Sequence, residues 1–526
     1  MESNFRRLSE NSGIFSETDT EIILSGEFFK IEEVVSVESL SEMSLLSQVS
    51  SGTSGGFAIN EDENINYMKN NPNLNLTGRN VIIAIADTGI DYLHPDFINA
   101  DGTSKILYLW DQTKEGNSPE GFYFGTEYTR EDINRAISEN DSTLSTDEVG
   151  SGTLLSGICA GLGVSNSLYE GVAKDSELIV IKLGTIDGKY NNAYYYVARD
   201  YARKKARELE RPLIINTSVG TNSDVGFINR ATQSTIWYQY GECEIAGIGN
   251  EGNTQTHASG KISAEGETQT VEIEIEEEEE FLKIELWICR PDRVNIKIIS
   301  PTGEESKDVG LGYYKNESGI FNFENTTYTV FYVFPTSYSG QEFITINLYN
   351  ASPGIWKINL TGVYINSGCY NVYLPNRSLI NQNTRFLEPD PFYTVNFPAV
   401  DRNIFTVGAY DMINNSMWPP SSRGPNIRNI QKPNIVAPGV NIISAYPHNR
   451  YGNITGTSAA AAVTSGVAAL FLQYVTQNNQ YKRQGFTQSI YSFFQLGADR
   501  EDNIQYPNFI YGYGLLNARK IFEEFR

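Results

Sequence analysis

Hydrophobic and polar positions follow one rhythm in most of the chain. Short apolar runs rich in β-branched residues alternate with longer segments of helical periodicity. The runs lie at 81–86, 178–183, 213–216 and 243–249, and the helical segments lie at 194–209 and 223–240. Continuous apolar runs fit strands buried on both faces, and strands that alternate with helices form mostly parallel sheets. This part of the sequence therefore predicts an α/β domain.

A second rhythm occupies residues 255–385. Apolar residues recur there at every second position, with turns between the runs, as in VEIEIE, FLKIELWI and YNVYLP. Such alternation is typical of antiparallel strands with one buried face. After residue 386 the first rhythm returns, with a strand predicted at 404–409 and a helix at 458–474. The pattern predicts an α/β fold with an inserted all-β jelly-roll domain.

The N-terminal region has weaker patterns. Segments 21–25 and 28–37 have the short apolar spacing of strands, and the Ser/Gly-rich segment 47–56 is predicted to be a linker. The first 30 residues are polar and contain no apolar leader, so we expect synthesis in the cytoplasm without a signal peptide. The apolar segment 458–472 is interrupted by polar residues and predicts a buried helix rather than a membrane span.

Charge and cysteine content narrow the classes of function. The 526 residues include 64 acidic and 40 basic side chains, a formal net charge of −24. Nucleic acids and anionic lipid surfaces attract basic proteins, so neither is an expected partner. The four cysteines form no CxxC pair, and a chain of this length needs no disulfides, so reduced buried thiols are expected. They are Cys159, Cys243, Cys289 and Cys369.

Three polar residues stand where chemistry is expected in an α/β sheet. Asp87 ends one buried run, Asn250 follows another, and Ser458 begins the predicted alanine-rich helix. Sites in such folds form beyond the carboxyl ends of the strands. Taken singly, each residue is explained as well by a turn or a helix cap.

Together, the three residues and their surroundings resemble the subtilisin-like serine proteases. The resemblance covers about 75–254 and 386–526, including GVAKDSELIVIKL, SSRGP and IVAPGVNIISA. It implies a mostly parallel sheet flanked by helices, with Asp87 as the triad carboxylate and Ser458 as the nucleophile. Asn250 would then stabilise the oxyanion. The segment formed by Ser218, Val219 and Gly220 would pair with an extended substrate.

One position departs from the family pattern. The family's Gly-His-Gly-Thr-His segment corresponds here to Gly150-Ser151-Gly152-Thr153-Leu154, so Ser151 takes the place of the general base. His94, His257 and His448 are the three histidines of the chain, and none lies in a matching motif. Loss of that histidine from an intact subtilisin site lowers turnover by roughly 10⁶-fold, a value measured in subtilisin itself. The resemblance therefore implies a catalytically inactive homologue.

The inserted domain makes the chain similar to the Csp-type spore germination subtilases of clostridia. This implies a truncated prodomain-like segment at 1–48, which stays attached because nothing cuts it. A subtilisin-like domain follows in two parts, 49–254 and 386–526, around the jelly roll at 255–385. The resemblance further implies location in the spore cortex or coat. The expected partner is a protein or peptide, such as another germination protease or a cortex-hydrolase zymogen.

Two alternatives remain open at this point. Besides a catalytically inactive regulator, the residues also allow an active endopeptidase that uses an unusual base to process a cortex-hydrolase zymogen, and a structural spore protein. No cofactor or metal ligand set is predicted. Calcium is left undecided, because Asp91 and Asp96 suit either ligands or turns.

Overall fold

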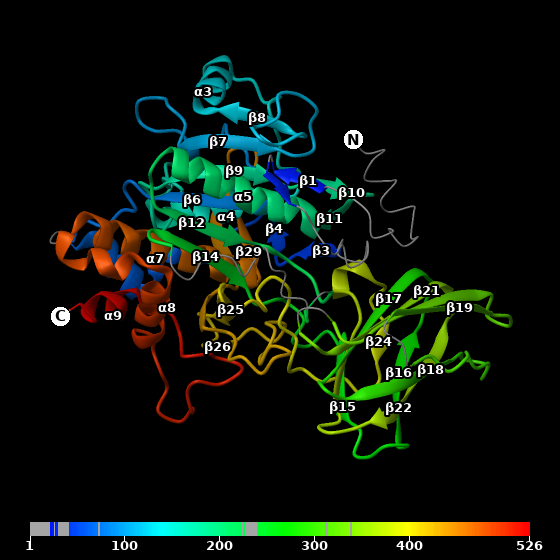
Figure 1. Cartoon of the computed structure of the whole chain (residues 1–526). Coiled ribbons are helices and arrows are strands. Elements are labelled where there is room, and N and C mark those ends of the chain that lie inside the picture. The colour runs from blue at the N-terminus through cyan, green and yellow to red at the C-terminus, as the bar shows by residue number, and fades with distance from the viewer. Residues whose placement is uncertain are drawn as a thin grey trace.

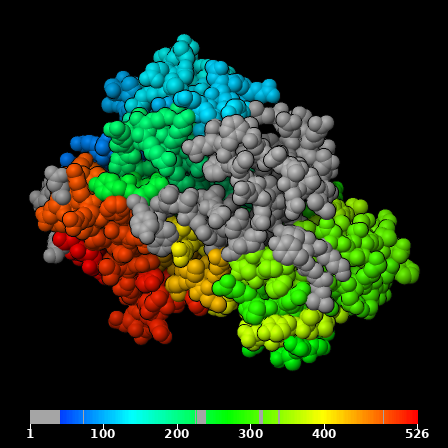
Figure 2. Space-filling view, viewed as in Figure 1, coloured from blue at the N-terminus to red at the C-terminus, as the bar shows by residue number. Residues whose placement is uncertain are grey.

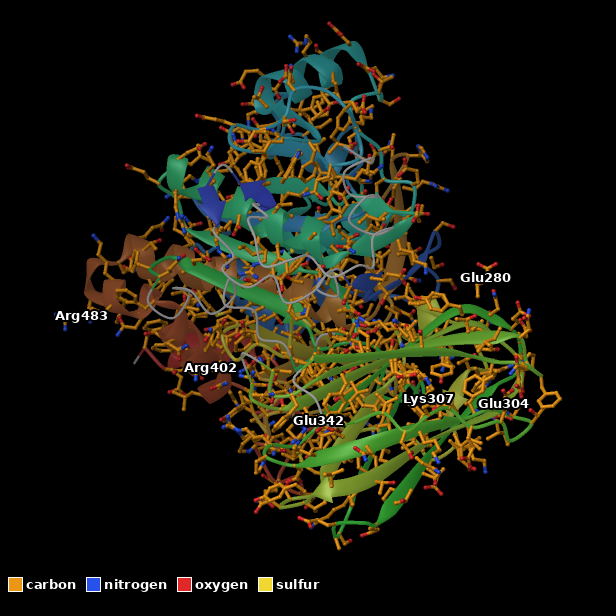
Figure 3. The ribbon with its side chains drawn as sticks, turned by 45° about the vertical axis from the view of Figure 1, so that its right-hand side comes forward. Glu280, Glu304, Lys307, Glu342, Arg402 and Arg483 are labelled. Carbon is orange, nitrogen blue, oxygen red and sulfur yellow. A yellow bond between two sulfur atoms is a disulfide. The ribbon has the colours of Figure 1, made fainter. Side chains whose placement is uncertain are left out.

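An α/β domain and an all-β domain lie side by side and form two lobes (Figure 1, Figure 2). The computed structural model describes residues 22–25, 27–29, 41–71, 74–223, 225–226, 239–310, 314–336 and 339–525. In Figure 3, Arg483 marks the helical side of the α/β lobe and Glu304 the far side of the all-β lobe.

A nine-stranded sheet forms the centre of the α/β domain. Its strand order is β26-β25-β14-β12-β6-β9-β7-β8, and β27 also pairs with β25. All pairs are parallel except β7 with β8 and β25 with β26. The strands are β6 (Ile82–Asp87), β7 (Ile106–Asp111), β8 (Thr126–Thr129), β9 (Glu177–Lys182), β12 (Leu213–Thr217), β14 (Glu242–Gly247), β25 (Phe405–Asp411), β26 (Ser416–Met417) and β27 (Ile435–Pro438).

Helices cover both faces of this sheet. Alternate residues of β6 divide between the faces, because successive side chains of a strand point in opposite directions. Ile83 and Ile85 join the core that contains α4 (Ser151–Ala160) and α7 (Thr457–Gln477), and Ala84 joins the core that contains α5 (Asn192–Glu208). The other α-helices among the described residues are α2 (Glu63–Asn70), α3 (Arg130–Glu139), α8 (Thr487–Leu496) and α9 (Ala518–Glu523).

The all-β domain consists of two antiparallel sheets that enclose a separate core. The six-stranded sheet has the order β15-β23-β17-β21-β20-β19, and the four-stranded sheet has the order β18-β22-β16-β24. The strands are β15 (His257–Lys261), β16 (Thr268–Ile275), β17 (Glu279–Ile288), β18 (Arg293–Ile299), β19 (Tyr314–Phe321), β20 (Thr326–Val333), β21 (Glu342–Ala351), β22 (Gly354–Tyr364), β23 (Cys369–Tyr373) and β24 (Arg385–Phe386).

The expectation of four reduced cysteines is wrong for one pair. Cys289 and Cys369 form a disulfide, with their Cα atoms 5.5 Å apart, whereas Cys159 and Cys243 are free and buried. The amide N–H of Cys289 also donates to the carbonyl of Cys369. The paired residues are 80 positions apart in the chain, and only the neighbouring positions of β17 and β23 bring them together.

Two smaller sheets include segments from the N-terminal part of the chain. One has the order β10-β11-β3-β13 and the other β4-β29-β28-β5. Their strands are β3 (Glu42–Leu45), β4 (Gln48–Ser50), β5 (Phe57–Ala58), β10 (Thr185–Ile186), β11 (Lys189–Asn191), β13 (Val219–Gly220), β28 (Ile442–Tyr446) and β29 (Arg450–Thr455). A two-stranded sheet pairs β1 (Ile22–Ser25) with β2 (Glu27–Phe29).

The sequence predictions of elements agree with most of this architecture. The α/β class and the inserted all-β domain are confirmed, and the predicted strands and helices of the α/β domain match β6, β9, β12, β14, β25, α5 and α7. Strand β7 was not predicted. The predicted linker at 47–56 is partly wrong, because residues 48–50 form β4 by pairing with β29. The helix predicted at 223–240 lies mostly outside the described residues.

Helix α7 is long and apolar enough to cross a membrane, but 89% of its most apolar window is buried inside the fold. This burial identifies it as a core helix. The high alanine content of its first turns allows close packing against the central sheet.

Candidate active site

Asp87 is fully buried at the carboxyl end of β6. Its Oδ1 accepts a 2.8 Å hydrogen bond from the amide N–H of Thr88, and its Oδ2 accepts a bond from the hydroxyl of Ser218. Burial raises the pKa of Asp87 to about 6, and these hydrogen bonds together with Ser151 partly oppose the rise. Among the described residues, the contacts that hold this carboxylate in place include no cationic side chain.

Ser151 is the first residue of α4, and its side chain is fully buried. Asp147 orders the start of this helix, because its carboxylate accepts bonds from the amide N–H groups of Gly150 and Thr153, at 2.7 Å and 2.8 Å. The hydroxyl of Thr88 lies 2.7 Å from the same carboxylate and connects the end of β6 to α4. These contacts place Ser151 next to the buried carboxylate of Asp87.

Ser458 lies in the first turn of α7 and contacts a backbone carbonyl from the N-terminal part of the chain. Its hydroxyl donates to the carbonyl oxygen of Leu46 at 2.8 Å, and its amide N–H points at the same oxygen at 3.2 Å. The hydroxyl of Ser47, the residue after Leu46, lies 3.0 Å from the hydroxyl of Ser151. The peptide bond between Leu46 and Ser47 is thus held between Ser458 and Ser151.

The segment 42–50 runs through this site, and we call it the strap. On its N-terminal side, β3 is antiparallel to both β11 and β13 and lies between them. The amide N–H of Leu46 continues the pairing by donating to the carbonyl of Ser218 at 2.8 Å. Side chains add a Glu42–Lys189 ion pair and a 2.6 Å hydrogen bond from Asn376 to Ser44.

The strap remains paired beyond the site. Strand β4 is antiparallel to β29, with Val49 opposite Ile454. Gly456 lies directly against the peptide between the two halves, since a Cβ at that position would be 2.1 Å from the carbonyl oxygen of Leu46. Its φ of 150° also disfavours a side chain. The chain is therefore seated on both sides of the Leu46–Ser47 bond.

Asn250 lies beside the start of α7. Its Oδ1 accepts bonds from the amide N–H of Thr457 at 3.1 Å and from the hydroxyl of Thr457 at 3.0 Å. These contacts fix the side-chain amide next to the residue that precedes Ser458. A role for Asn250 as an oxyanion donor stays a prediction.

The three histidines are held elsewhere in the structure. His94 contacts the carbonyl of Arg450 at 2.9 Å, and the two ring nitrogens of His257 have hydrogen-bond partners at 3.0 Å in the backbone of Asp390 and the side chain of Asn371. His448 is in an exposed loop. Within the described ranges, no histidine is hydrogen-bonded to Asp87, Ser151 or Ser458.

Two of the predicted site residues contact the Leu46–Ser47 dipeptide: Ser458 through the carbonyl of Leu46 and Ser151 through the hydroxyl of Ser47. Asp87 and Asn250 lie beside these two, at Ser151 and Thr457, and β13 with Ser218 pairs with the strap. Pairing of β13 with a substrate stays a prediction. Sequence reasoning missed Ser47, Asp147 and Gly456. The sequence held a signal for Gly456, because a glycine directly before a helix, here the helix that begins at Thr457, indicates a special backbone conformation or a close contact. Ser47 had none, because only the fold brings it to Ser151.

The carboxylates considered for calcium have protein donors. Asp91 accepts from the amide N–H groups of Leu93 and His448, and Asp96 accepts from the N–H of Val164 and the hydroxyl of Tyr451. Among the described residues, no group of three or more acidic, histidine or cysteine side chains is placed to hold a metal ion.

The family model described as "Subtilase family" matches residues 78–275 and 376–514, which is more than half of the chain. The protein belongs to the subtilase family. A solved structure of the CspB protease of Clostridium perfringens superposes with a TM-score of 0.80 and 26% identity, covering 88% of this chain and 98% of that chain. The fold of this subtilase is therefore close to that of CspB.

Curated relatives match over shorter stretches. The serine protease AprX of Bacillus subtilis is 34% identical over 145 residues, which cover 24% of this chain and 31% of AprX. A subtilisin of Bacillus sp. strain TA39 is 30% identical over 194 residues, covering 36% of this chain and 39% of that protein. The matched stretches thus span less than half of these relatives.

Replacing Asp87 with Asn is expected to stabilise this subtilase at neutral pH. The folded pKa of about 6 lies above the usual 3.8, so ionisation of the buried carboxylate lowers the free energy of unfolding. This destabilisation is absent below about pH 4 and complete above the folded pKa. The shift corresponds to a gain of about 3 kcal/mol at pH 7.5 for Asp87→Asn. Chemical unfolding at pH 7.5 and pH 4 measures it. A gain that is equal at both pH values would contradict the explanation, and the exposed Asp502→Asn serves as the control.

Proposed function

We propose that this subtilase is a regulatory pseudoprotease of the spore germination type. It keeps the fold and the ordered site of a serine endopeptidase, but it does not hydrolyse peptides supplied from outside. The observation that carries the proposal is the hydroxyl of Ser151, which stands beside buried Asp87 where the family places an imidazole.

The chemistry of Ser151 supports the loss of turnover. A serine nucleophile needs a neighbouring base with a pKa near neutral to accept its proton, and a hydroxyl cannot do this. The hydroxyl of Ser458 instead donates to the carbonyl of Leu46. The described histidines are anchored in other hydrogen bonds or lie in an exposed loop, so none supplies the missing imidazole.

The strap supports a regulatory role. It occupies the edge of β13 that an extended substrate would use, and it pairs on both sides of Ser458. A peptide from another protein must displace the pairing of the strap with β13 and β29 before it can bind there, and this competition favours partners that bind another surface. We propose a germination protease or a cortex-hydrolase zymogen as the partner, in the cortex or coat of the spore.

A second candidate is an active endopeptidase with an unusual base. The two contacts from Ser458 to the carbonyl oxygen of Leu46 favour it, because donors at this oxygen are what acyl transfer requires. Asp87, with a pKa of about 6, would then be the base through Ser151.

A fluorophosphonate probe tests the proposal. We expect the wild-type chain to show no labelling above that of Ser458→Ala, whereas Ser151→His, which restores the imidazole, is expected to label at Ser458. Fast labelling of the wild type at Ser458 would exclude the pseudoprotease and favour the second candidate. Binding of the purified chain to a cortex-hydrolase zymogen, measured by calorimetry, tests the regulatory role.

A further inference from the structure

One row of side chains crosses the outer face of the six-stranded sheet in the all-β domain. The strand registers place Phe281 of β17 opposite Tyr349 of β21, Tyr349 opposite Thr327 of β20, and Thr327 opposite Ile320 of β19. Successive side chains of a strand point to opposite faces. The neighbours of the row along the four strands belong to the core of the domain, so the row itself points outward. These neighbours are Leu282, Leu348, Tyr328 and Phe321.

The row is exposed and largely apolar. The exposed fractions are 42% for Phe281, 38% for Tyr349 and 49% for Ile320, and the rings of Phe281 and Tyr349 lie 5.3 Å apart. Phe323, in the turn after β19, is 82% exposed. Four neighbouring strands at a spacing of about 4.8 Å make the row roughly 14 Å wide. Exposed aromatic side chains gathered in this way are typical of protein interfaces.

The same face of the sheet already serves as a contact surface at its other end. Trp287 and Val333 both lie opposite Phe343 there, and all three are buried in the core that contains α5 of the α/β domain. Six residues of β17, about 20 Å of strand, separate Trp287 from Phe281. The α/β domain therefore covers one end of this face, and the row at the other end is exposed.

Acidic side chains without ion pairs lie beside the row. The segment that leads into β17 has four exposed glutamates, and none of them forms an ion pair within the described residues. They are Glu276, Glu277, Glu278 and Glu280, of which Glu280 projects from the upper edge of the all-β lobe in Figure 3. By contrast, Glu305 is paired with Lys297 at 3.0 Å. Lys283, the next outward residue of β17, is neutralised by Glu285 at 2.8 Å. The apolar row thus has a negatively charged rim.

The acidic segment is ordered by the chain that leaves the all-β domain. The buried carboxylate of Glu279 accepts bonds from the amide N–H of Asn381 at 2.9 Å and from the hydroxyl of Thr384 at 2.5 Å. The guanidinium of Arg377 donates to the carbonyl of Asn381 at 2.7 Å, and the amide N–H of Arg377 donates to the carboxylate of Glu251 in the α/β domain. A charged surface that is already fixed loses little conformational entropy when it binds a partner.

We infer that the row and the acidic segment 276–280 together form a docking surface for a protein partner, which we call the sheet-end surface. The partner presents an apolar side chain flanked by lysine or arginine, because the row requires an apolar counterpart and the glutamates require cations. A second copy of this chain, with a net charge of −24, would add negative charge to the same rim, so it is not the expected occupant.

This inference rests on the proposed function and deepens it. A regulator whose β13 edge is occupied by the strap needs another surface for its partner, and the sheet-end surface is one that the strap does not reach. A row of about 14 Å accommodates one short segment of a partner, which is typical of a transient complex.

A subtractive peptide selection tests the chemistry of the occupant. A phage library of random peptides of about twelve residues is passed first over the double variant Phe281→Ser with Tyr349→Ser and then over the wild-type chain. We expect the peptides that only the wild type retains to carry at least two lysine or arginine residues beside an aromatic or aliphatic side chain. Their affinity is expected to fall at least tenfold when Glu276, Glu277 and Glu278 are all replaced with Gln, and to fall with added salt.

Two matched variants serve as controls. Ile355→Ser removes a side chain that is 42% exposed from the four-stranded sheet, and a triple variant with Gln at Glu115, Glu131 and Glu139 removes three exposed charges from the α/β domain. Both are expected to bind the selected peptides within about twofold of the wild type, since neither touches the sheet-end surface. Thermal unfolding shows that each variant is folded. If no peptide survives the subtraction, or if the survivors are neutral or acidic, the sheet-end surface is overturned.

Calorimetry with a cortex-hydrolase zymogen separates this inference from the proposed function. Binding that weakens at least tenfold in Phe281→Ser with Tyr349→Ser supports both. Binding that is equal in this variant and the wild type overturns the sheet-end surface as the docking surface and leaves the proposed partner in place. A zymogen that does not bind the wild type overturns that partner, while the peptide selection still decides the sheet-end surface.

Discussion

The Ser151→His variant is expected to cut its own chain between Leu46 and Ser47. An imidazole at the start of α4 would stand between Asp87 and Ser458, where it can take the proton of the serine hydroxyl. The carbonyl of Leu46 already accepts hydrogen bonds from Ser458, so the bond to be cut needs no further movement into the site. The expected gain over the wild type is on the order of 10⁵-fold or more. Mass spectrometry and N-terminal sequencing of the freshly purified variant measure it.

Two controls make this result specific. Ser151→Asn places a side chain of similar size without a base at the same position, and it is expected to remain uncut on this timescale. The double variant Ser151→His with Ser458→Ala is also expected to remain uncut, because the imidazole then has no nucleophile to activate. A folded Ser151→His chain that stays whole would show that more than the imidazole is missing from the site.

The Gly456→Ala variant is expected to push the strap out of the site. The added Cβ would lie 2.1 Å from the carbonyl oxygen of Leu46 and 2.9 Å from the Cα of Ser47, and a φ of 150° adds backbone strain. Overlap of this kind costs about 1–3 kcal/mol, and here it is removed when the strap leaves. The expected result is rapid cleavage within 42–50 by an added protease, together with a lower melting temperature.

Gly52→Ala is the matched control for this substitution. A Cβ at Gly52 meets no atom within 4 Å, so its effect on stability is expected to stay within about 0.5 kcal/mol. A Gly456→Ala chain whose strap resists the protease as well as the wild-type strap does would contradict the close packing described for this peptide. Digestion outside the strap would instead indicate damage to α7.

The sequence allowed a site residue to be predicted where its own neighbours in the chain position it. Asp87 follows a continuous apolar run, and Ser458 begins an alanine-rich helix, so each is positioned by the end of an element that its own neighbours specify. The replacement at Ser151 was visible for the same reason, because it falls inside a motif of contiguous residues. These signals required no knowledge of contacts between distant segments.

Contacts between distant segments explain what the sequence analysis missed. Cys289 and Cys369 are 80 residues apart, and only neighbouring strands of the all-β domain bring them together. Residues 48–50 have the composition of a linker, yet they form a strand because β29 offers them an unpaired edge. Backbone pairing of this kind depends on the partner strand and leaves little trace in the composition of either segment.

The amino-acid sequence by itself determined the subtilase fold, the inserted all-β domain and the absence of an imidazole from the expected place, because periodicity and contiguous motifs encode them. Only the tertiary structure decided what lies in the site. Leu46 and Ser47 are more than 400 residues from Ser458 along the chain. The folding of β3 and β4 onto strands from three other parts of the protein is what sets their peptide bond against that serine.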